Sequence, residues 1–139
     1  MSYNEKKMQS EFTAWMRDQK KKGKFNFSMV FELKVCHQKR FAFSKIEEHQ
    51  ITSLNKANQS CLFHKISDQG MGFKPFDGFQ ICNVPAYLII LFYEPRKPKE
   101  LIWIPIQHLN YLKQDNSTIK SITEEEAKQI GQTHLMYAL

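Results

Sequence analysis

The longest apolar run in this chain is the eight-residue segment 86–93, AYLIILFY. It falls far short of the roughly 20 residues that a membrane-spanning helix needs, and it predicts a buried strand. Four further segments also predict strands, and the five together indicate a central mixed sheet flanked by helices. The expected strands cover residues 26–36, 60–67, 76–83, 86–93 and 100–106. The fold class expected from this pattern is α/β (α+β).

The first segment of the chain predicts an amphipathic helix. Between residues 4 and 22, Met8, Phe12, Trp15 and Met16 recur at helical spacing, with charged residues on the other faces. The segment ends in a lysine cluster and Gly23, where cations complement the helix dipole.

Two later segments carry the sequence pattern of a capping box. Ser44 and Glu47 predict a helix over about 45–58, and Thr123 with Glu126 predicts a short helix to about residue 130. The final residues 134–139 are apolar for a tail, so we expect them to dock on the body of the protein or on a partner subunit.

Length and charge bound the function. A chain of 139 residues is the size of one domain, so we treat residues 1–139 as a single unit. The formal net charge of +6 suits a polyanionic partner such as DNA, although such a charge also serves solubility. The candidate contacts to DNA phosphates are Lys20, Lys21, Lys22, Lys24, Lys39, Arg40, Lys45, Lys65 and Lys74.

Cysteine usage and the N-terminal segment indicate an intracellular protein. No apolar segment resembling a signal peptide occurs in residues 1–24, so we expect a cytoplasmic location. The odd number of cysteines argues against a disulfide framework. Cys36, Cys61 and Cys82 each fall in an expected strand, and we expect them to be thiols of the core.

A charged pair interrupts the apolar segment 29–36. Glu32 and Lys34 are two residues apart, so in a strand their side chains point to the same face. A carboxylate can hold a divalent ion, and an ammonium group can steady a nucleophilic water and the charge that grows on a phosphate. This pair therefore indicates a metal-dependent hydrolytic site, with a solvated ion pair as the alternative.

Four segments together resemble a nuclease superfamily. FELKV (31–35), FAFSKI (41–46), EEHQITSL (47–54) and KPFDGF (74–79) are similar to the PD-(D/E)XK superfamily, specifically its Holliday junction resolvase-like and RecU-like members. The resemblance implies a restriction-endonuclease-like core. In that family the aspartate strand precedes the E-x-K strand, whereas Asp77 follows Glu32 here, which implies a circularly permuted order. Asp18 is the alternative aspartate upstream of Glu32.

The resemblance also implies a metal site for Mg²⁺ or Mn²⁺. Asp77 and Glu32 are its expected carboxylate ligands, and the backbone carbonyl of Leu33 is a third oxygen. Lys34 is expected to orient the attacking water or to help deprotonate it.

Three further residues are candidates for this site. Glu11 on the first helix is a possible metal ligand, with a solvated surface glutamate as the alternative. Gln50 is expected either to reach the catalytic water or lysine, or to be a buried amide with hydrogen bonds. Asp68 is read as a turn residue in preference to a second metal ligand.

The function implied by these features is a magnesium-dependent DNA endonuclease that cuts branched DNA in recombination or repair. Symmetric cleavage of a four-way junction needs two active sites, so a homodimer is expected. A phage or another mobile element would suit such a small nuclease as its source. The alternatives are a catalytically silent nucleic-acid-binding domain of the same fold and an interaction protein with no DNA affinity.

Overall fold

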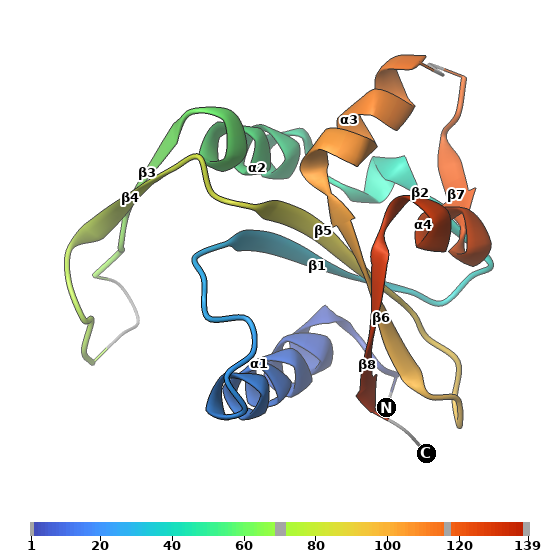
Figure 1. The fold of residues 1–139 in the computed structure, drawn as a ribbon, viewed down its shortest axis with the longest axis horizontal. Coiled ribbons are helices and arrows are strands. Elements are labelled where there is room, and N and C mark those ends of the chain that lie inside the picture. The colour runs from blue at the N-terminus through green and yellow to red at the C-terminus, as the bar shows by residue number, and fades with distance from the viewer. Residues whose placement is uncertain (1, 69–71, 116–117, 138–139) are drawn as a thin grey trace.

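The computed structural model of the chain describes residues 2–68, 72–115 and 118–137. Within these ranges it is a mixed arrangement of helices and strands (Figure 1). In chain order the elements are α1 (Glu5–Lys21), β1 (Val30–Cys36), β2 (Arg40–Ala42), the 3₁₀ helix η1 (Phe43–Lys45), α2 (Glu48–Gln59), β3 (Cys61–Lys65), β4 (Gly78–Cys82), β5 (Ala86–Phe92), β6 (Lys99–Pro105), α3 (Ile106–Asp115), β7 (Ser121–Thr123), α4 (Glu124–Ile130) and β8 (Gln132–Tyr137).

The main sheet has four strands, in the order β1-β5-β6-β8. β1 and β5 are parallel, while β5 with β6 and β6 with β8 are antiparallel, so the sheet is mixed as expected. The apolar segment 86–93 contains β5, which lies inside the sheet and is buried along most of its length.

The expectation of five strands in this sheet is wrong. The segments 60–67 and 76–83 do form strands, but β3 and β4 pair only with each other and make a separate hairpin. Most of their side chains are exposed, so the hairpin has no buried face to place in the core. The fourth position in the sheet is taken by β8, which the sequence indicated only as an apolar tail; Ala138 and Leu139 of that tail lie outside the described residues.

Helices cover both faces of the main sheet. In Figure 1, α1 lies below the sheet and α2, α3 and α4 lie above it, while the β3–β4 hairpin extends away at the left. Two apolar clusters fill these layers. The first cluster, which includes Met8, Phe12 and Trp103, lies between the sheet and α1. The second cluster, which includes Phe41 and Ile104, lies between the sheet and the helices on the other face.

The helix ends follow local capping chemistry, with one correction. α1 begins where the Asn4 side chain accepts the Lys7 backbone N–H, and α4 begins at the expected capping box of Thr123 and Glu126. The expected cap at Ser44 is wrong, because Ser44 lies inside η1 and Ile46 is extended. α2 instead begins after Glu47, whose capping box uses Gln50.

The cysteines also differ from expectation. Cys61 and Cys82 face each other in the register of the hairpin and form a disulfide, so the prediction of three core thiols is wrong for this pair. Only Cys36 is a buried free thiol. Counting cysteines could not reveal the pairing, because it depends on two strands 21 residues apart meeting in that register.

Among the helices that the structure describes, none combines the length and apolar character required to cross a bilayer.

Candidate functional site

The side chains of Glu32 and Lys34 lie on the same face of β1, as the sequence predicts. Val30 and Cys36, whose side chains point to this same face of β1, pack in the apolar cluster between the sheet and the helices α2, α3 and α4. Leu33 lies in the cluster under α1, on the other face. The charged pair is therefore on the α2 side of the sheet, and β1 is an edge strand of that sheet.

A solvent-open depression of about 230 Å³ lies beside Glu32. α2 contributes His49, Gln50 and Ser53 to its wall, and Leu62 of β3 closes one side. The structure thus brings Glu32 and Gln50 to the same depression, although they are 18 residues apart in the sequence. Sequence reasoning does not predict His49 or Leu62 as part of a site, because no motif assigns either residue a role there.

The electrostatics of the depression disfavour the charged form of Glu32. Partial burial raises the pKa of the Glu32 carboxyl, and the positive charge of Lys34 and the His49 ring offset only part of that effect. The carboxylates of Glu47 and Glu5 raise the pKa further. A half-buried carboxylate in this condition is stabilised in its charged form by any additional cation that reaches it.

Gln50 has a structural hydrogen bond at this site. Its side-chain oxygen Oε1 accepts the backbone N–H of Glu47 at 3.0 Å, as part of the capping box that starts α2. The cap holds the amide of Gln50 at the first turn of the helix, where it lines the depression beside Glu32. Gln50 is therefore a hydrogen-bonded amide, as one alternative expects, but it is only partly buried, and its expected contact with the catalytic water or lysine stays a prediction.

Asp77 lies in a different depression, on the hairpin. That depression measures about 590 Å³, and its lining includes Lys65, Asp68, Lys74 and Asp77. Lys74 Nζ lies 3.2 Å from Asp77 Oδ1 and also contacts the Asp68 carboxylate. The carboxylates of Asp68 and Asp77 therefore converge on one ammonium group.

The structure does not bring Asp77 to Glu32. The carbonyl of Asp77 accepts the backbone N–H of Ile66 at 2.7 Å, which places Asp77 opposite Ile66 across the hairpin. Ile66 is four residues beyond Leu62, which closes the Glu32 depression, and at about 3.3 Å per residue this corresponds to roughly 13 Å along the strand. The side chain of Asp77 is 93% exposed.

Glu11 is held on the opposite face of the sheet. Lys99 Nζ donates to both carboxylate oxygens of Glu11, at 2.9 and 3.1 Å, and the Tyr3 hydroxyl donates to Oε1 at 2.5 Å. Burial alone would raise the pKa of the Glu11 carboxyl, but these hydrogen bonds and the charges of Lys99 and Lys7 hold that pKa below its usual range. The structure thus places Glu11 in a largely buried ion pair, away from Glu32.

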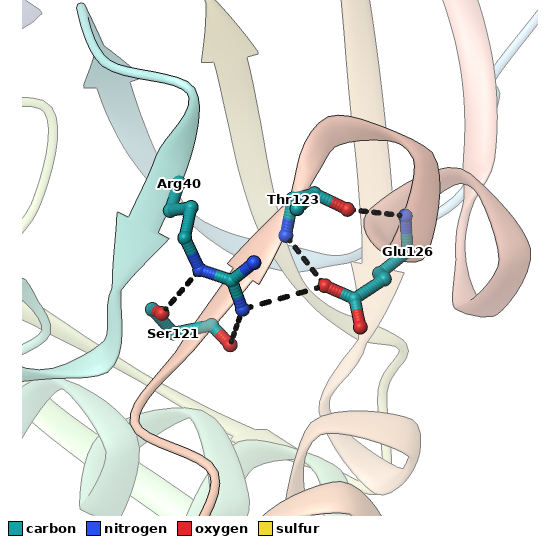
Figure 2. A network of polar contacts seen from close by, with 4 residues as sticks. All are labelled: Arg40, Ser121, Thr123 and Glu126. Atoms are coloured by element: carbon teal, nitrogen blue, oxygen red, sulfur yellow. Dashed lines mark hydrogen bonds and ion pairs between the residues drawn. The ribbon is translucent and has the colours of Figure 1, made fainter.

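Arg40 is engaged in a network that joins β2, β7 and α4 (Figure 2). Its guanidinium donates to Ser121 Oγ at 2.8 Å and to the Ser121 carbonyl at 3.2 Å, and it lies 3.6 Å from Glu126 Oε1. Glu126 is itself the N3 residue of the capping box of Thr123. Arg40 therefore has intramolecular partners at the position where the sequence suggested a phosphate contact.

The remaining basic candidates fall in separate places. Lys20, Lys21, Lys22 and Lys24 lie at the end of α1 and just beyond it, where Lys22 pairs with Asp18 at 3.1 Å. Asp18 is thus a helical surface residue. Lys39 lies between β1 and β2, Lys45 in η1, and Lys65 and Lys74 on or beside the hairpin.

The depression beside Glu32 offers a single carboxylate to a metal ion. No group of three or more His, Cys, Asp or Glu side chains among the described residues is arranged to hold a metal ion. Glu32 is the one carboxylate in the lining of its depression. Mg²⁺ retains several waters and is commonly held by one or two carboxylates together with substrate phosphates.

Comparisons with protein-family models, curated proteins and solved structures give no match for this chain.

Proposed function

We propose that this chain is a Mg²⁺-dependent DNA endonuclease of the PD-(D/E)XK type, with a restriction-endonuclease-like core and a homodimeric form that acts on branched DNA. The observation that carries the proposal is the set of Glu32, Lys34 and Gln50. Two of these residues share one face of β1, and the third is held by α2 at the same depression.

Each residue of the set has a defined task. Glu32 holds Mg²⁺ (or Mn²⁺), with the Leu33 carbonyl as a neighbouring oxygen. When bound, the ion supplies charge neutralisation at the phosphate and lowers the pKa of a water. Lys34 positions the attacking water and offsets negative charge as the phosphodiester reacts. Gln50 contributes its amide at the edge of the site.

The hairpin carries the carboxylates of Asp77 and Asp68 in a separate depression, so Glu32 is the carboxylate ligand in this proposal. Asp77 and Asp68 converge on Lys74, so two carboxylate groups already share a cation on a projecting arm of the protein. Exposed aromatic side chains on the same arm, such as Phe63 and Phe79, suit contact with DNA bases.

The test is cleavage of an end-labelled four-way junction and a matching linear duplex in the presence of Mg²⁺. Glu32→Gln and Lys34→Met should each lower the rate at least about 100-fold, because they remove the metal ligand and the group that positions the water. Glu94→Gln is the matched control, since Glu94 is an exposed glutamate paired with Lys97 in a turn. Cleavage that survives Glu32→Gln would contradict the proposal.

A catalytically silent DNA-binding domain is the second candidate. It is favoured by the separation of Asp77 from Glu32, which leaves one carboxylate in the depression. DNA binding without cleavage by the wild-type chain, in either Mg²⁺ or Mn²⁺, would establish this second function. Asp77→Asn tests whether the hairpin takes part in cleavage. If this variant loses cleavage, the hairpin carboxylate acts at the reaction site.

A further inference from the structure

An apolar groove of about 270 Å³ opens between α1 and β1, on the face of the sheet opposite Glu32. We call it the α1 groove. Four apolar side chains and two cationic ones contribute to its lining: Phe12, Met16, Phe25 and Phe31, with Arg17 and Lys20. No acidic side chain is present among the described residues that line it.

Aromatic rings are exposed in and beside this groove. Phe31 is 41% exposed and packs against Phe12, with ring centroids 4.9 Å apart. Phe27 is 50% exposed, and its ring centroid lies 6.4 Å from that of Phe25. Phe31 therefore rests on the buried ring of Phe12 and Phe27 on the partly buried ring of Phe25, and both present a ring to solvent.

Positive charge surrounds the groove. The segment 17–24 contains five cationic residues and a single acidic one, Asp18, whose carboxylate contacts Lys22. A polyanion complements this surface. A second copy of the chain does not, because a two-fold contact would bring the same cationic segment of each copy together.

We propose that the α1 groove binds a single strand of nucleic acid, with bases stacked on Phe27 and Phe31 and phosphates near Arg17 and Lys20. This rests on the proposed function, because it names the place where unpaired DNA is held. Stacking on aromatic side chains together with a cationic groove is how proteins hold single strands with little sequence preference. A duplex keeps its bases stacked inside, so the rings select unpaired segments.

The place of the groove relates it to the candidate catalytic site. Phe31 and Glu32 are consecutive residues of β1 and point to opposite faces of the sheet. β1 is an edge strand, so the two faces are separated only by this strand. A single strand of nucleic acid that follows the cationic end of α1 into the groove can therefore pass around the edge of the sheet at β1 toward Glu32.

The experiment measures binding of a fluorescent oligothymidylate and of a duplex of equal length in EDTA, where cleavage does not occur. Phe27→Ala with Phe31→Ala should weaken single-strand binding by roughly five- to a hundredfold per stacked base lost and should change duplex binding much less. Arg17→Ala with Lys20→Ala should lower the salt dependence by about 0.7 for each phosphate contact removed. Leu135→Ala, an exposed apolar residue on β8, is the matched control.

The outcomes separate this inference from the proposed function. Unchanged single-strand affinity in the folded double variant, or in Phe27→Ala alone, would overturn the inference. Sedimentation velocity tests the other occupant, since a dimer that dissociates only in the double variant would show that a second copy fills the groove. If the variants change binding as expected but the wild type cleaves no DNA in Mg²⁺, the proposed nuclease activity is contradicted and the single-strand site in the α1 groove is supported.

Discussion

The Glu11–Lys99 ion pair should couple α1 to β6 strongly enough to measure. We consider Glu11→Gln, Lys99→Met and the double variant. Gln retains the shape of the glutamate, and Met retains the apolar stem of the lysine, whose ammonium lies 4.5 Å from the Tyr3 ring and 5.1 Å from the Tyr137 ring. The three variants therefore change charge while changing little volume.

The magnitude follows from burial and geometry. The two side chains are 20% and 21% exposed, and the ammonium donates to both carboxylate oxygens. Exposed pairs contribute about 0.2–1 kcal/mol, and removing one partner of a fully buried pair costs about 3–5 kcal/mol. We therefore expect Glu11→Gln to lower the free energy of unfolding by about 2 kcal/mol at pH 7, with a coupling energy of about 1.5 kcal/mol in the cycle.

The cost of Glu11→Gln should also depend on pH. The pKa of Glu11 is lowered in the folded state from its ordinary value of 4.5, so the folded state favours the carboxylate. The stability that this carboxylate contributes is present above pH 4.5 and is lost as the pH falls through the lower pKa of the folded state. The difference between the wild type and Glu11→Gln should therefore shrink as the pH is lowered from 7 to below 4.

Urea unfolding followed by circular dichroism, at pH 7 and at acidic pH, measures both quantities. Glu94 and Lys97 supply the matched control cycle, because their side chains approach to 2.7 Å but are 60% and 64% exposed. That pair should show a coupling too small to measure, because water screens two exposed charges. An equally small coupling for Glu11 and Lys99 would refute the reasoning. So would a Glu11→Gln variant of unchanged stability that has lost Mg²⁺ binding, since Glu11 would then be a metal ligand.

Two further predictions concern packing and the hairpin. Gly131→Ala should destabilise the fold by about 1–3 kcal/mol in thermal unfolding, because a Cβ there would lie 2.7 Å from the Trp103 carbonyl oxygen. Gly72→Ala is the control, because a Cβ there would meet no described atom within 4 Å, and equal effects would contradict the close approach of Gly131 to β6. Replacing Cys61 and Cys82 by Ser should lower the free energy of opening of the hairpin by roughly 2–4 kcal/mol. Amide hydrogen exchange should then accelerate in β3 and β4 with little change in β5, and acceleration throughout the main sheet would show instead that the disulfide supports the core.

Much of the local structure follows from short stretches of sequence. The periodicity of Met8 and Phe12 predicts α1, the capping box of Thr123 predicts α4, and the apolar segment 86–93 predicts the buried strand β5. The sequence pattern does not predict α3, although Ile106 and Leu109 are buried at helical spacing, because the expected strand 100–106 includes the first residue of this helix.

Local sequence likewise predicts one part of the candidate site and not the other. Alternation along β1 was enough to place Glu32 and Lys34 on one face, since side-chain direction in a strand repeats every two residues. The expectation that Asp77 stands beside Glu32 required a contact between distant segments, and the structure instead pairs Asp77 with Lys74 on the hairpin.

The sequence by itself thus determined most helices and strands, with α3, β2, β7 and β8 as the exceptions, and which way the charged pair on β1 points. These properties depend on residues within a few positions of one another. Tertiary structure alone decided that β8, and not the β3–β4 hairpin, completes the sheet, that Cys61 meets Cys82, and that α2 brings Gln50 to Glu32. Many strand pairings satisfy the same local pattern, and the choice among them is made by which apolar faces can be buried together.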